Sequence, residues 1–147
     1  MEGPTGGGQA GEQTYAFLLE LRGPGEASST QSFEDDYGAS RVYLHLTYKN
    51  TGSSFLLTSV SGYYELQDSG VEVTSTALHY ACASTDTVQT GVQRPSGAFC
   101  YATAFTEAVA GQGYVGAAWT LNYYTDPEHH WSYTCEMRLL DTMSPPW

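Results

Sequence analysis

The feature that most constrains the fold is a two-residue alternation of apolar and polar side chains. In residues 41–49, Val42, Leu44 and Leu46 alternate with residues whose side chains carry a polar group. Residues 131–140 repeat the pattern. Successive side chains of a β-strand point to opposite faces, so each segment predicts a strand with one buried face. No long segment has the period of an amphipathic helix, which favours an all-β fold.

Turn residues divide the chain into about eight short strands. The segments expected to be extended are 14–22, 41–52, 53–60, a hairpin across the turn at 68–70, 77–83, 98–105, 111–125 and 131–140. Residues 23–40 predict a long loop, and residues 105–111 predict one turn of helix at most. This pattern predicts a single β-sandwich, Ig-like or jelly-roll-like, with a closed barrel as the alternative.

One stretch carries a resemblance to a known class of domain. A strand ends in Asn50-Thr51-Gly52, and residues 55–70 then lead to the turn Asp68-Ser69-Gly70. The order of these features resembles secreted bacterial Ig-like domains, in which a strand ends in Asn-Thr-Gly and a later hairpin carries an Asp-x-Gly turn. The resemblance implies an Ig-like fold for this stretch and names no site residue.

The two ends of the chain differ in composition from the strand-rich middle. Residues 1–13 are rich in glycine and polar residues, so they predict a flexible Gly-rich N-terminal arm that a neighbouring subunit would order. Residues 14–142 are the expected β-sandwich domain. Residues 143–147 are a tail with two prolines and a final Trp147, which indicates a rigid aromatic plug.

Charge and hydropathy disfavour several classes of partner. The net charge is −11, and the one lysine and four arginines are scattered, which argues against nucleic acid and anionic membranes. No apolar run approaches the roughly 18 residues of a membrane span. Residues 1–13 lack the basic and apolar regions of a signal peptide. We therefore expect a chain that is not exported by that route, or a mature secreted chain with a new Met.

The three cysteines are Cys82, Cys100 and Cys135, and none forms a CxxC pair. An odd number leaves at least one thiol unpaired within a monomer. The sequence favours small apolar side chains buried in strands. In an oxidising compartment, a Cys82–Cys100 disulfide is the favoured pairing.

Residues 125–131 read TDPEHHW and place two histidines beside two acids. Asp126-Pro127 is suited to starting a type I turn, so a hairpin loop of roughly five residues is expected, with Glu128, His129 and His130 at its exposed tip. A zinc site would need three or four converging ligands, and adjacent strand side chains diverge. A metal site and a pH-responsive contact through the imidazoles are the alternatives.

Other sequence features give little support to catalysis or metal binding. The acids of residues 33–38 (FEDDYG) lack the alternating spacing of an EF-hand loop, so a solvated loop is favoured over a weak cation site. No GxSxG motif is present, and no glycine-rich loop follows a strand. His45 and His79 lie in strand-like segments. We expect no catalytic, metal or cofactor residues.

Aromatic side chains are the most informative part of the expected surface. The adjacent tyrosines at 63–64 and 123–124 place one ring on each face of their strands, so one ring of each pair can remain outside. Outward rings suit protein interfaces or stacking on sugars, and core packing is the alternative use. The residues expected at such an interface are Tyr63, Tyr64, Tyr123, Tyr124, Trp131 and Trp147.

These observations favour a non-enzymatic assembly protein over an enzyme. Its expected partner is itself or a neighbouring structural protein, as in a virion decoration or tail-surface protein or an extracellular filament subunit. Strand addition at a sheet edge, or exchange of the N-terminal arm, would provide the contact. The first alternative is a small carbohydrate-binding β-sandwich, and the second is a hydrolase with an unrecognised triad.

Overall fold

The structure is a computed structural model that describes residues 11–18, 25–35, 37–50 and 53–147, with side chains from Ser28 onward. The described residues form ten strands and no helix, which confirms the all-β prediction. The strands are β1 (Gly11–Leu18), β2 (Gly25–Glu34), β3 (Ser40–Asn50), β4 (Ser54–Leu66), β5 (Glu72–Ser84), β6 (Val88–Gln93), β7 (Phe99–Ala102), β8 (Val109–Ala110), β9 (Gly113–Asp126) and β10 (His129–Asp141).

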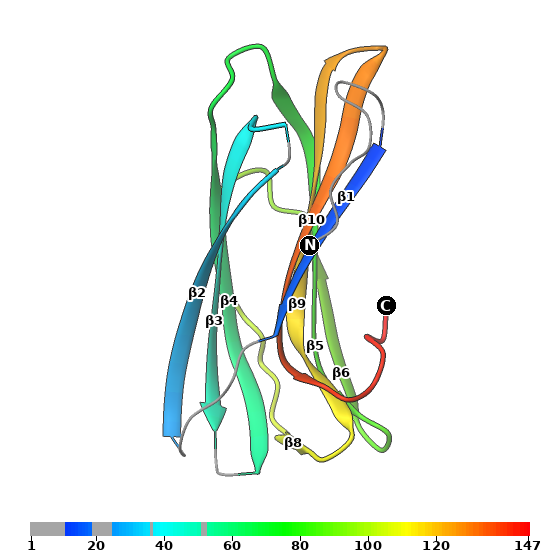
Figure 1. The fold of residues 1–147 in the computed structure, drawn as a ribbon. Helices are drawn as coiled ribbons and strands as arrows, with labels where there is room; N and C mark the ends of the chain where they lie inside the picture. The colour runs from blue at the N-terminus through cyan, green and yellow to red at the C-terminus, as the bar shows by residue number, and fades with distance from the viewer. Residues whose placement is uncertain (1–10, 19–24, 36, 51–52) are drawn as a thin grey trace.

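The strands form two sheets that face each other (Figure 1). Sheet A has the order β1-β10-β9-β5-β6, and sheet B has the order β2-β3-β4-β7, with β8 also paired to β4. Only the β1–β10 pair is parallel among the described pairs; all others are antiparallel. No pairing joins the two sheets among the described strands, so these strands do not form the closed barrel that was the alternative.

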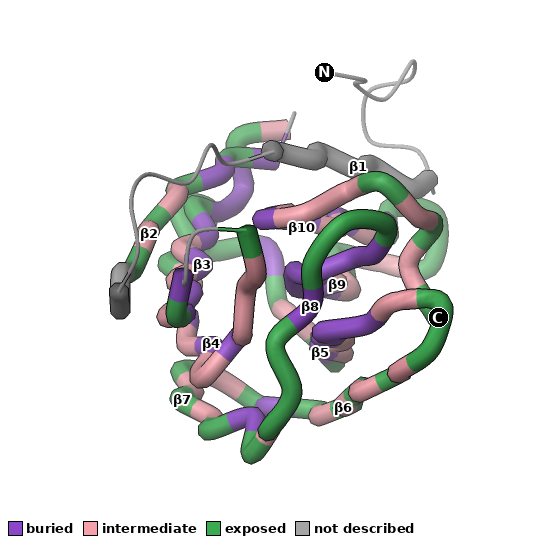
Figure 2. Tube along the Cα trace, turned by 90° about the horizontal axis from the view of Figure 1, so that it is seen from below, coloured by how far each residue is buried: buried purple, intermediate pink, exposed green. Residues whose placement is uncertain are grey.

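The core lies between the sheets, where the buried residues of both layers meet (Figure 2). Inward positions alternate with outward ones, as in β3, whose buried Val42, Leu44 and Leu46 were predicted from the sequence. Trp119 of sheet A is fully buried and lies edge-on to Phe99 of sheet B at a ring distance of 4.7 Å. This contact joins the two layers.

Strand β2 corrects the prediction of a long loop over residues 23–40. Ten residues, from Gly25 to Glu34, pair with β3 in continuous register. The segment is rich in serine and threonine, and Phe33 is its only large apolar side chain in the core. Its strand structure therefore depends on backbone hydrogen bonds to β3, which local composition does not reveal.

The turn at residues 68–70 connects the two sheets, so the predicted hairpin across it is wrong. Strand β4 before the turn belongs to sheet B and β5 after it belongs to sheet A. The turn itself was predicted correctly: the Gly70 amide donates to Asp68 Oδ1 at 2.9 Å, and the Val71 amide donates to the Asp68 carbonyl at 3.2 Å. Local turn chemistry does not specify whether the next strand stays in the same sheet.

Several boundaries also differ from those predicted. The β9–β10 hairpin has a two-residue connection, residues 127–128, instead of a loop of about five residues. Residues 109–110 form the short strand β8 instead of helix. Strand β1 begins at residue 11, within the predicted arm, while residues 1–10 lie outside the described part.

Candidate functional site

The predicted interface aromatics separate into exposed and buried groups. Tyr63 and Tyr124 are on the outer faces of their strands and are 45% and 37% exposed. Tyr123 and Trp131 are instead buried and stack on each other at a ring distance of 5.2 Å. Their side chains belong to the core, which removes both from the predicted surface. Tyr64 is half-buried and packs toward Trp119.

The Trp147 side chain contacts the outer face of this chain's own sheet A. Its ring lies edge-on to Tyr114 at 5.1 Å and 5.5 Å from His79. Thr142 fixes the start of the tail, because its amide donates to the Gly113 carbonyl at 3.0 Å. The tail therefore occupies a surface within the same chain, whereas the sequence suggested docking on a partner.

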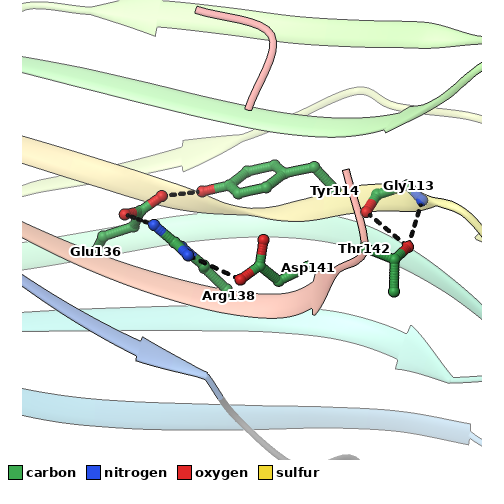
Figure 3. A network of polar contacts seen from close by, with 6 residues as sticks. All are labelled: Gly113, Tyr114, Glu136, Arg138, Asp141 and Thr142. Carbon is green, nitrogen blue, oxygen red and sulfur yellow. Dashed lines mark hydrogen bonds and ion pairs between the residues drawn. The ribbon is translucent and has the colours of Figure 1, made fainter. Parts of the chain in front are cut away.

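A polar network lies on the outer face of sheet A near the start of this tail (Figure 3). Tyr114 donates to Glu136 Oε2 at 2.5 Å, and Arg138 contacts Glu136 Oε1 and Asp141 Oδ2, each at 2.7 Å. Burial and the neighbouring Glu136 carboxylate raise the pKa of Tyr114 well above its usual range. The network links β9 to β10, and within the described contacts the Arg138 Nε is the one buried atom of this group without a partner.

The histidine pair lies at an exposed hairpin end. His129 Nδ1 is 2.7 Å from Asp126 Oδ1, and the same oxygen accepts the Glu128 amide at 2.9 Å. The hydrogen bond from His129 lowers the pKa of Asp126. Both histidines belong to β10 rather than to the loop, and their exposure agrees with the predicted hairpin tip.

The acidic run at residues 33–38 is only partly the solvated loop that was predicted. Asp35 is 2% exposed, and its Oδ1 accepts the Ser40 amide at 2.7 Å and the Ser40 hydroxyl at 3.2 Å. Ser40 in turn contacts the Tyr123 hydroxyl at 2.6 Å. Burial raises the pKa of Asp35. This carboxylate secures the β2–β3 turn, where Gly38 has a φ of +70°.

The three cysteines are free thiols, so the predicted Cys82–Cys100 disulfide is not formed. Cys82 is buried on the inner face of sheet A, and its sulfur lies 3.4 Å from the Phe55 carbonyl oxygen. Cys100 is exposed on β7 of sheet B. The two side chains occupy different faces of different sheets and cannot meet. Cys135 is buried as predicted, and burial raises its pKa strongly.

Within the described part of the chain, there is no group of three or more His, Cys, Asp or Glu side chains that could hold a metal ion. His45 Nδ1 hydrogen-bonds to the Thr30 hydroxyl on the outer face of sheet B. Within the described contacts, no carboxylate reaches His45, so the pair lacks the third group of a catalytic triad.

A shallow groove of about 380 Å³ lies on the outer face of sheet B. Tyr43 and Tyr63 stack beside it with ring centroids 4.4 Å apart, and His45 and Ser61 contribute polar groups. Tyr63 was predicted at an interface, but Tyr43 was not included, because the register that places it opposite Tyr63 comes from the β3–β4 pairing. The surface combines aromatic and hydrogen-bonding groups.

Strand β6 forms an exposed edge of sheet A and was not predicted. Among the described strands, it pairs with β5 alone. Val88 and Val92 on its outer face are 63% and 50% exposed, the largest exposed fractions among the exposed large hydrophobic residues described. The strand reads VQTGVQ, without charge or proline, so it lacks the usual features that block pairing with another strand.

Comparison with protein-family models, with curated proteins and with solved structures finds no match for this chain. Among the described residues, no helix has the length and apolar character needed to cross a membrane.

Proposed function

We propose that this protein is a non-enzymatic structural protein that acts through contacts with copies of itself or with a neighbouring structural protein. The observation that carries the proposal is the β6 edge, which is open, uncharged and flanked by exposed valines. Such an edge is a template for an added strand. A virion decoration or tail-surface protein, or an extracellular filament subunit, is the setting that we propose.

Comparison of the sheet edges supports β6 as the contact. The edge strands β1 and β2 contain glutamates, at positions 12, 26 and 34, and β7 has only four residues. Charges and short length are the features by which natural sheets discourage edge pairing. Strand β6 combines six residues with no charge, so it is the edge best suited to addition among the described strands.

We also propose the Ig-like rather than the jelly-roll class for the two-sheet fold. A jelly roll contains eight strands in two Greek keys. Here β2, β3 and β4 are consecutive neighbours in one sheet, and β1 runs parallel to the last strand, β10. These two features depart from the jelly-roll arrangement.

The test of the proposed function is the solution mass over a hundredfold range of concentration, measured by light scattering. We expect a mass that rises above the 16.0 kDa of one chain. The double variant Val88→Lys/Val92→Lys should remain at the mass of one chain, because charge at the edge opposes pairing. Val88→Thr/Val92→Thr is the matched control and should still assemble. A constant mass of one chain for the wild-type protein would contradict self-assembly.

The groove beside Tyr43 and Tyr63 supports a second candidate function, carbohydrate binding. The stacked rings of Tyr43 and Tyr63, next to imidazole and hydroxyl groups, would provide apolar contact and hydrogen bonds for a sugar. This function predicts retention on a polysaccharide column that is lost in Tyr43→Ala/Tyr63→Ala. The variant Tyr124→Ala, which removes an exposed ring of sheet A, is the control. Equal elution of wild-type protein and both variants would exclude this candidate for the polysaccharides used.

A further inference from the structure

The hydrogen-bonding pattern of β6 shows which backbone groups are open. The Ser84 amide donates to the Thr87 carbonyl at 2.6 Å, which makes these two residues a hydrogen-bonded pair of the β5–β6 hairpin. Hydrogen-bonded and non-hydrogen-bonded pairs alternate along antiparallel strands. Residues 89, 91 and 93 therefore bond to β5, and the N–H and C=O groups of Val88, Thr90 and Val92 point to the open edge.

The side chains of these outward-bonding residues also lie on a single face. Val88, Thr90 and Val92 are exposed, whereas the alternate residues are partly buried. The Gln89 side chain donates to the Cys82 carbonyl at 3.0 Å, and the Gln93 side chain donates to the Tyr80 hydroxyl at 3.3 Å. The inner face thus holds the strand in place, so little ordering is needed before another strand binds.

We infer that two copies of this chain pair through β6 in antiparallel orientation, with the two-fold axis at Thr90. This inference rests on the proposed function and specifies its partner and contact. The register places Thr90 opposite Thr90 of the other copy and Val88 opposite the other copy's Val92. All of these residues direct their backbone groups outward, as the hydrogen-bonded pairs of an antiparallel ladder require.

The same register brings opposite charges together just beyond the strand. Asp86 precedes β6 by two residues, and Arg94 follows it directly; both are exposed. An axis at Thr90 brings the turn residue Asp86 of each copy to the same end of the contact as Arg94 of the other. Opposite charges across a strand pair stabilise it, and like charges destabilise it. The charge pattern therefore favours a second copy of this chain in antiparallel orientation.

The contact between the two β6 strands is small. Six residues of one strand and a row of three side chains give an interface at the small end of the range for protein pairs. The dimer is therefore expected at high protein concentration. Its formation joins the two copies of sheet A into one continuous sheet.

A charge exchange tests the register of this dimer. Arg94→Asp should weaken dimerisation by about tenfold or more, because it brings two acids together at both ends of the contact. Asp86→Arg/Arg94→Asp should restore wild-type dimerisation, because the pairs reform with reversed sign. Sedimentation equilibrium measures both effects. Failure of the double variant to recover would overturn the proposed register.

Cross-linking provides a second measurement that does not depend on charge. Residues of a hydrogen-bonded antiparallel pair have Cα atoms about 5.5 Å apart, within the range for a disulfide. Thr90→Cys in a Cys100→Ala background should give a covalent dimer on mild oxidation. Ser28→Cys in the same background is the control, since this exposed residue lies on β2 of sheet B. Equal cross-linking of the two variants would contradict pairing at β6.

These results separate two kinds of failure. Wild-type protein could have a mass above that of one chain, and both Arg94→Asp and Val88→Lys/Val92→Lys could leave that mass unchanged. This result would overturn β6 pairing, and the protein would then assemble through another surface. A wild-type protein that stays a single chain at every concentration would overturn both the dimer and the proposed self-assembly.

Discussion

Asp35 is a buried carboxylate whose surroundings give the fold a specific pH dependence. Its Oδ1 accepts two hydrogen bonds from Ser40, but Oδ2 is buried without a partner among the described contacts. Burial is the largest influence and raises its pKa above the ordinary value of 3.8. The folded protein therefore holds this proton more tightly than the unfolded chain, so stability is lost as pH rises through the raised pKa.

Asp35→Asn should remove this loss of stability, because an amide resembles the protonated acid in shape and stays neutral. We expect the free energy of unfolding of the variant, relative to wild-type protein, to increase from about pH 4 to pH 7. Urea unfolding at several pH values measures the difference, and Glu72→Gln, which changes an exposed carboxylate, is the control. A relative stability that falls with pH would contradict the assigned direction.

Tyr114→Phe tests the polar network on the outer face of sheet A. The variant keeps the ring but removes the hydroxyl that donates to Glu136 at 2.5 Å, leaving a buried carboxylate oxygen short of a donor. We expect a loss of about 1–3 kcal/mol in the free energy of unfolding. Tyr63→Phe, at an exposed tyrosine, should change it by less than about 0.5 kcal/mol. Equal effects would show that the hydroxyl of Tyr114 contributes nothing.

Individual side chains were predictable where strand alternation alone decides their environment. The division of the tyrosine pair at 123–124 into one buried and one exposed ring follows from alternation. The sequence does not say which ring faces inward, so Tyr123 and Trp131 were wrongly included in the interface. The burial of Asp35 depends on Ser40 and Tyr123, and Tyr123 is far away in sequence.

At the level of elements, Gly116 controls how closely β9 approaches β10. A Cβ atom at this position would lie 2.3 Å from the Met137 carbonyl oxygen, which belongs to the backbone and cannot rotate away. Gly116→Ala should therefore lower the free energy of unfolding by about 1–3 kcal/mol or more. Gly97→Ala, with nothing within 4 Å of the added atom, is the control and should change it by less than about 0.5 kcal/mol. Chemical denaturation of the two variants measures this contrast; similar stabilities would show that β9 and β10 can separate at low cost.

The strands that were predicted correctly have an apolar inner face of their own. Alternation in β3 and β10 is visible because the core takes several large side chains from each. Strand β2 was missed because its neighbour β3 supplies most of the buried surface. Strand β6 was missed because its inner residues are Gln89, Gly91 and Gln93, which read as loop residues.

For the whole molecule, the net charge of −11 opposes the approach of two copies. The Debye length is about 30 Å at 10 mM salt and about 8 Å at 150 mM, so added salt screens this repulsion. We expect the dimer dissociation constant to fall between these salt concentrations. Sedimentation velocity at both salt concentrations measures it. A dissociation constant that rises with salt would mean that the local Asp86–Arg94 pairs outweigh the net repulsion.

The order of strands in the two sheets is the property that sequence patterns describe least. Pairing partners such as β9 and β5 are distant in the chain, and alternation is the same for central and edge strands. The identity of the open edge, and thus the candidate interface, depends on this order. The two-layer all-β class could be predicted from local patterns, whereas the β6 surface required the arrangement of the complete fold.

The most direct test of the central claim is amide hydrogen exchange of β6, measured by NMR at low and high protein concentration. Val88, Thr90 and Val92 should exchange quickly in dilute protein and become protected as concentration rises, because their amides bond to the second copy. Residues 89, 91 and 93 should be protected at both concentrations by β5. Exchange at Val88, Thr90 and Val92 that stays fast at every concentration would contradict pairing through β6.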